Sequence, residues 1–162
     1  MKTATVRELK QELSNQSHSE LLELCLSLSK FKKENKELLT YLLYESDHEE
    51  GFIEGVKNEV EEQFTLINRD SYYYIKKSVR KILRTVKKYI RYSKKKETEV
   101  ELLLHFCSEL KKMNPSIQNN VSLVNIFNRQ IDLIRKIVSS LHEDLQYDYE
   151  MELNELLKNF KK

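Results

Sequence analysis

Hydrophobic residues recur every three or four positions along most of the chain. That spacing matches the 3.6-residue turn of an α-helix, so the apolar side chains fall on one face of each helix. The pattern predicts eight helical segments, at about residues 5–13, 20–28, 35–44, 47–67, 72–92, 98–112, 123–145 and 150–160. Residue pairs with the spacing of a capping box are predicted to start three of them: Thr5 with Glu8, Ser17 with Glu20, and Thr98 with Glu101.

Glycine and proline are scarce, with two Gly and one Pro in 162 residues. Sheets joined by tight turns usually need more of both, so the composition also favours helices. The chain length is within the usual range for one domain. We therefore predict a single all-α domain over residues 1–162, with seven to eight helices. They pack either as an irregular bundle or as a short stack of α-hairpins of the HEAT or armadillo type.

The segment at about 123–145 has the widest apolar face. Its main stripe consists of Phe127, Ile131, Ile134, Val138, Leu141 and Leu145, and it is widened by Ile126, Leu133 and Ile137. A helix with so wide an apolar arc is usually covered on two sides. We expect this helix at the centre of the fold or at a homodimer interface, with Ile134 and Val138 among the most deeply buried residues.

The two cysteines and the start of the chain bear on the compartment. Cys25 and Cys107 each lie among leucines in a predicted helix, so we expect two buried free thiols. The first residues are charged and lack the apolar segment of a secretory signal. No stretch approaches 18 uninterrupted apolar residues, so no membrane span is predicted. These features favour a soluble protein in the cytoplasm.

Charge is distributed unevenly although the net charge is only +2. Residues 45–70 carry nine acids against two bases, whereas residues 71–96 carry eleven Lys or Arg and no acid. On a helical wheel, the cations of the segment at about 72–92 cover one arc opposite its apolar stripe, roughly 24 Å long. We call this arc the basic face; it consists of Lys76, Lys77, Arg80, Lys81, Arg84, Lys87, Lys88 and Arg91.

Several interpretations of the basic face are open. Cations one turn apart repel each other and destabilise a helix, so a chain that keeps them can have a polyanionic partner. Nucleic acid, an acidic protein and anionic lipid all fit that description. Alternatively, the face is only solvated, serves self-association, or is neutralised by the acidic helix at about 47–67. On a wheel the charged faces of both helices point outward, which limits such pairing to their edges.

Local motifs for catalysis or metal binding are missing from the sequence. No GxSxG or Gly-rich phosphate loop occurs, and the cysteines and histidines do not cluster. Glu45 and His48 form an ExxH pair, but a di-iron site would need a second such pair. We therefore predict no catalytic residue, no metal site and no cofactor. The tyrosines at 72–74 suggest stacking on bases, although residues at the edge of the core explain them equally well.

Taken together, these features favour a non-enzymatic binding or scaffold protein that acts through charged helix surfaces. The alternative is a nucleic-acid-binding module that uses the basic face. A helical-repeat enzyme acting on DNA is a more distant possibility. The expected partners are an acidic protein or nucleic acid, and a second copy of the chain through the segment at about 123–145.

Overall fold

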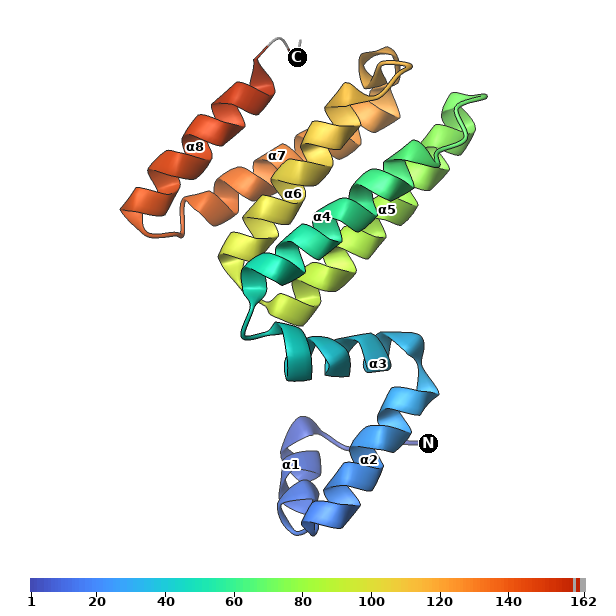
Figure 1. The fold of residues 1–162 in the computed structure, drawn as a ribbon, viewed down its shortest axis with the longest axis vertical. Coiled ribbons are helices and arrows are strands. Elements are labelled where there is room, and N and C mark those ends of the chain that lie inside the picture. The colour runs from blue at the N-terminus through green and yellow to red at the C-terminus, as the bar shows by residue number, and fades with distance from the viewer. Residues whose placement is uncertain (159, 161–162) are drawn as a thin grey trace. The chain divides into compact units, whose positions relative to one another are not determined.

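A computed structural model describes residues 1–158 and Phe160, and this part of the chain contains eight α-helices and no strand (Figure 1). The all-α prediction is thus confirmed. No helix in the described residues is both long and apolar enough to cross a membrane. The chain divides into two compact units, Met1–Tyr44 and Glu45–Lys162, which are described separately. That residues 1–162 form one domain stays a prediction.

The N-terminal unit contains three helices, α1 (Val6–Ser14), α2 (His18–Phe31) and α3 (Lys33–Thr40), followed by a π-helical turn, Tyr41–Glu45. Helices α2 and α3 pack against each other. Both capping boxes predicted here are confirmed. The Thr5 hydroxyl accepts from the Glu8 amide while the Glu8 carboxylate accepts from the Thr5 amide, and Ser17 and Glu20 repeat the arrangement. These reciprocal bonds satisfy amides that an uncapped helix would leave free.

The helices of the N-terminal unit bury none of their residues. Val6 is 83% exposed and Leu28 is 61% exposed, although both lie on predicted apolar faces. Cys25 is also exposed, so the prediction that it is a buried thiol was wrong. The physical reason is that periodicity shows which side chains share a face, whereas burial needs another element to cover that face.

The C-terminal unit packs five helices as an all-α bundle, α4 (Glu49–Thr65), α5 (Tyr72–Ser93), α6 (Lys96–Lys112), α7 (Val121–Val138) and α8 (Glu143–Leu157), with a short 3-10 turn, Ile117–Asn119, before α7 (Figure 1). Its centre is α6, which contacts α4, α5, α7 and α8. Of the two places predicted for the helix at about 123–145, the centre of the fold is thus occupied by α6, and a homodimer interface stays a prediction. Eight residues of α6 are buried: Thr98, Val100, Leu102, Leu103, Leu104, Phe106, Cys107 and Leu110.

Helix α7 is part of the core but is shorter than predicted. Ile134 and Val138 are 0% and 2% exposed, which confirms their predicted burial. The helix ends at Val138, so the predicted extent of 123–145 was wrong at its C-terminal end. Ser139 and Ser140 follow, and their hydroxyls donate to backbone carbonyls three residues earlier. Such local bonds compete with the helical backbone ladder and favour a turn.

The carboxylate of Glu49 joins the start of α4 to the turn between α5 and α6. It accepts hydrogen bonds from the hydroxyls of Ser93 and Thr98, the latter at 2.6 Å, and pairs with the Lys95 ammonium at 2.9 Å. Thr98 was predicted to cap the sixth helix with Glu101, but α6 begins at Lys96 and Thr98 lies inside it. Its buried hydroxyl needs a partner, and Glu49 supplies one.

Candidate functional site

Helix α5 is held in the bundle by its apolar stripe. Ile75, Val79, Ile82 and Val86 are 0–2% exposed, and Ile90 is 8% exposed. The helix packs on α4 and α6. Residues on the opposite side of α5 therefore point away from the core, because one helix cannot present both faces to the same neighbours.

The basic face lies on that outer side of α5. Six of its residues are exposed and Lys76 and Lys88 are half-buried; the exposed ones are Lys77, Arg80, Lys81, Arg84, Lys87 and Arg91. The ammonium of Lys88 lies 4.5 Å from the centre of the Tyr89 ring, a favourable cation–π contact. The bundle thus leaves most of these cations in contact with solvent.

Within residues 1–158 and Phe160, most of the basic face is not neutralised by acidic residues. Seven of its eight cations take part in no ion pair there; they are Lys76, Lys77, Arg80, Lys81, Arg84, Lys87 and Arg91. Three carboxylates of α4 have other partners instead. Glu49 pairs with Lys95, Glu59 accepts a hydrogen bond from the Tyr89 hydroxyl at 2.7 Å, and Glu61 faces His105. Seven cations thus repel one another without a compensating carboxylate among the described residues.

A shallow groove of about 750 Å³ runs along the same side of α5. It is lined by Tyr73, Lys76, Lys77, Arg80, Leu83, Arg84 and Lys87, which places one aromatic ring and one aliphatic side chain among five cations. Tyr73 is 66% exposed and its ring meets that of Tyr74 edge to face, with 5.4 Å between centroids. Tyr72 is half-buried and its hydroxyl donates to the Ser116 carbonyl at 2.9 Å, which fixes this end of α5.

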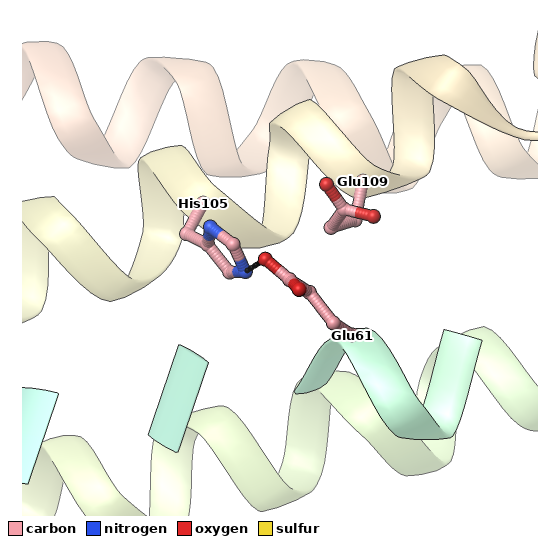
Figure 2. Close-up of side chains that lie close together, drawn as sticks. All are labelled: Glu61, His105 and Glu109. Atoms are coloured by element: carbon pink, nitrogen blue, oxygen red, sulfur yellow. Dashed lines mark ion pairs between the residues drawn. The ribbon is translucent and has the colours of Figure 1, made fainter. Parts of the chain in front are cut away.

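A second cluster of polar side chains lies between α4 and α6. His105 and Glu109 are one turn apart on α6, and Glu61 faces them from α4 (Figure 2). Burial lowers the pKa of His105, and this effect outweighs the opposite influence of the Glu109 and Glu61 charges. The imidazole is therefore neutral near pH 7, and its contact with Glu61 is not an ion pair at that pH.

Sequence reasoning missed this cluster. The candidate metal pair in the sequence was Glu45 with His48, and neither residue belongs to the cluster. The spacing of His105 and Glu109 was a local signal that both side chains share a face of α6. No local signal connects either residue to Glu61, because that contact depends on how α4 packs on α6.

The thiol of Cys107 is not arranged for nucleophilic chemistry. Cys107 is buried, and desolvation raises the pKa of its thiol far above the ordinary value, so the reactive thiolate is suppressed. Cys25 is exposed and belongs to the N-terminal unit.

No protein-family model, curated protein or solved structure matches this chain. Two local arrangements bear on what the chain can bind: the basic face of α5 and, separately, the cluster of Glu61, His105 and Glu109.

Proposed function

We propose that this chain is a non-enzymatic helical binding protein that holds a polyanion on the basic face of α5. The observation that carries the proposal is the set of seven cations without an ion-pair partner among the described residues. Acidic residues are nearly as numerous as basic ones, 26 against 28, so pairing would not be limited by their supply. A surface that keeps its cations together and unpaired presents a strong positive potential to a partner.

Among polyanions, nucleic acid fits the surface best. A phosphate backbone offers regularly spaced negative charges, which suits cations repeated along a helix. The groove adds Tyr73, whose exposed ring can stack on a base, beside Lys76 and Lys77. Binding through these contacts would be largely independent of base sequence, because phosphate contacts position a protein without reading bases.

An anionic membrane is less well suited to this helix. Amphipathic helices that lie on membranes bury their apolar face among the lipid chains. The apolar stripe of α5, including Ile75, Val79 and Val86, is already buried inside the C-terminal unit. Contact with lipid headgroups would therefore rely on charge alone.

Fluorescence anisotropy with labelled double-stranded DNA, single-stranded DNA and an acidic peptide tests the proposal. We expect DNA binding at about 50 mM salt that weakens steeply as salt rises, since each neutralised phosphate adds close to one unit to the log–log slope on duplex DNA. Reversal of four exposed cations of the basic face should abolish it; the substitutions are Arg80→Glu, Arg84→Glu, Lys87→Glu and Arg91→Glu. Circular dichroism should stay unchanged, because these side chains do not build the core.

A matched control has the same change in net charge elsewhere on the chain. It reverses four exposed cations of α1, α2 and α3: Arg7→Glu, Lys10→Glu, Lys30→Glu and Lys36→Glu. We expect this variant to retain most of the binding. Equal loss in both variants would mean that binding follows net charge and not the basic face. Absence of binding to either DNA at low salt would refute the nucleic-acid assignment, and tight binding of the acidic peptide alone would replace nucleic acid with an acidic protein.

A further inference from the structure

The cluster between α4 and α6 brings three metal-ligating side chains together. One ligand atom each from Glu61, His105 and Glu109 lies within 4.8 Å of the others. Figure 2 shows the imidazole of His105 and the carboxylate of Glu61 directed at each other, with Glu109 on the same side of α6. Two of the ligands are thus fixed by one helical turn and the third comes from a second helix.

The imidazole nitrogen at the centre of this cluster lacks a hydrogen-bond partner. His105 Nε2 is shielded from solvent, and no described residue satisfies it. The Glu61 Oε1 atom lies 3.4 Å away but is not positioned for a hydrogen bond. Buried polar atoms are usually satisfied, and each exception calls for an explanation such as an ion that completes the site. A cation between the nitrogen lone pair and the carboxylate would satisfy both groups.

The separation of these two atoms matches the edge of a tetrahedral zinc site. Zinc binds histidine nitrogen and carboxylate oxygen at about 2.0–2.2 Å, which places neighbouring ligands roughly 3.3–3.6 Å apart. The observed 3.4 Å between His105 Nε2 and Glu61 Oε1 falls in that interval. The Glu109 carboxylate can close the remaining distance by rotation about its side-chain bonds, and water can take the fourth position.

The ligand set also separates metals by class. Ca²⁺ prefers six to eight oxygen ligands, and Mg²⁺ prefers octahedral oxygen, so a neutral imidazole with two carboxylates suits neither ion. Imidazole is a good ligand for Zn²⁺ and other divalent first-row transition metals.

The bound ion would compete with the cation that pairs with Glu109. The Lys112 ammonium lies 2.7 Å from Glu109 Oε1, and the Lys112 side chain is 67% exposed. An ion pair one helical turn apart whose lysine is exposed contributes little to stability, so a divalent ion can displace the lysine. Lys57 also lies on this side of α4, but its ammonium is engaged by Glu101 at 3.0 Å.

We propose that Glu61, His105 and Glu109 form a binding site for Zn²⁺ or a chemically similar divalent transition-metal ion, which cross-links α4 to α6. The site is separate from the basic face, and metal binding there does not depend on whether α5 binds a polyanion. An ion that binds the native state and not the unfolded chain stabilises the fold by mass action.

Titration of the full chain with Zn²⁺ tests this site, by isothermal calorimetry for stoichiometry and by thermal unfolding for stability. We expect one ion per chain and a rise in unfolding temperature at saturating Zn²⁺. His105→Ala and Glu109→Gln should each weaken binding by at least about tenfold, a loss typical even of residues that only support a metal's ligands. Lys112→Ala should strengthen Zn²⁺ binding, because the substitution removes the competing cation and leaves all three ligand residues unchanged.

Two controls separate this site from other ligands on the chain. Cys25→Ser removes the exposed thiol, and His142→Ala removes an exposed imidazole of the same unit. Both should bind Zn²⁺ as the unchanged chain does. Co²⁺ in place of Zn²⁺ gives visible absorption bands that report four-coordination, and His105→Ala should lose them. Absence of saturable binding, unchanged affinity in both His105→Ala and Glu109→Gln, or loss of binding in Cys25→Ser alone would overturn the proposal.

Discussion

Replacing Phe106 with alanine tests whether α6 is the centre of the C-terminal unit. The side chain is 0% exposed, and its ring lies 5.8 Å from that of Phe64 on α4, centroid to centroid. A buried aromatic side chain removes roughly 150–250 Å² from water, which at about 25 cal/mol/Å² corresponds to about 4–6 kcal/mol. Alanine retains part of that contact but leaves a cavity, and buried Phe→Ala substitutions cost about 3–5 kcal/mol. We expect a loss of that size in the free energy of unfolding.

Urea unfolding followed by far-ultraviolet circular dichroism measures this loss. The matched control is Leu66→Ala, because Leu66 follows α4 and is 75% exposed. It should change stability by no more than about 0.5 kcal/mol. A loss below about 1 kcal/mol for Phe106→Ala, with an unchanged slope of unfolding free energy against urea concentration, would refute the central position of α6. A cavity at a fully packed site destabilises a protein by more than that.

The same substitution reports on the proposed metal site. Phe64 and Glu61 lie one turn apart on α4, and they face Phe106 and His105 on α6. The contact between the two rings is therefore one of those that hold Glu61 near His105. We expect Phe106→Ala to weaken Zn²⁺ binding even under conditions where the chain stays folded, because the ligands would be held less firmly.

Two further expectations concern titratable side chains. In the native chain a thiol reagent should label Cys25 quickly and Cys107 slowly, with both labelled in denaturant; equal native rates would contradict the burial of Cys107. Burial, with smaller contributions from Glu101, Glu97 and Glu152, raises the pKa of Tyr149 from its ordinary 10.0 to about 12. The folded chain then keeps a proton that the unfolded chain has lost, so stability should fall as the pH rises from about 10 to about 12. Tyr149→Phe should lose less stability across that interval in parallel urea titrations, and an identical loss would rule out this cause.

Much of the fold could be predicted from local pattern. The start of α5 and its buried stripe of Ile75, Val79, Ile82 and Val86 follow from a 3.6-residue period within one continuous segment. The two capping boxes at Thr5 and Ser17 are equally local, because both partners lie three residues apart. Predictions from the sequence were wrong where contacts between helices decide the structure. At Thr98, for example, the hydroxyl does not cap the helix but donates a hydrogen bond to Glu49 inside the bundle.

The central helix illustrates the limit of periodicity. Helix α7 has the wider apolar arc in sequence, yet α6 contacts four other helices. In α6, Leu102 and Phe106 are buried although they lie outside the apolar stripe formed by Val100, Leu103, Leu104, Cys107 and Leu110. Residues around most of a helix become buried only when neighbours cover several of its sides, and the number of neighbours is not encoded in one helix's repeat.

The sequence by itself determined which cations share a face of α5, because helical geometry alone places side chains three and four residues apart on one side. The tertiary structure decided that six cations of this face stay exposed and that seven have no ion-pair partner among the described residues. Three carboxylates of α4 contact Tyr89, Lys95 and His105 instead. The tertiary structure also decided that Glu61 meets His105 and Glu109, an encounter between two helices. Contacts within a helix follow from its own period, whereas contacts between helices depend on the packing of every side chain in the interface.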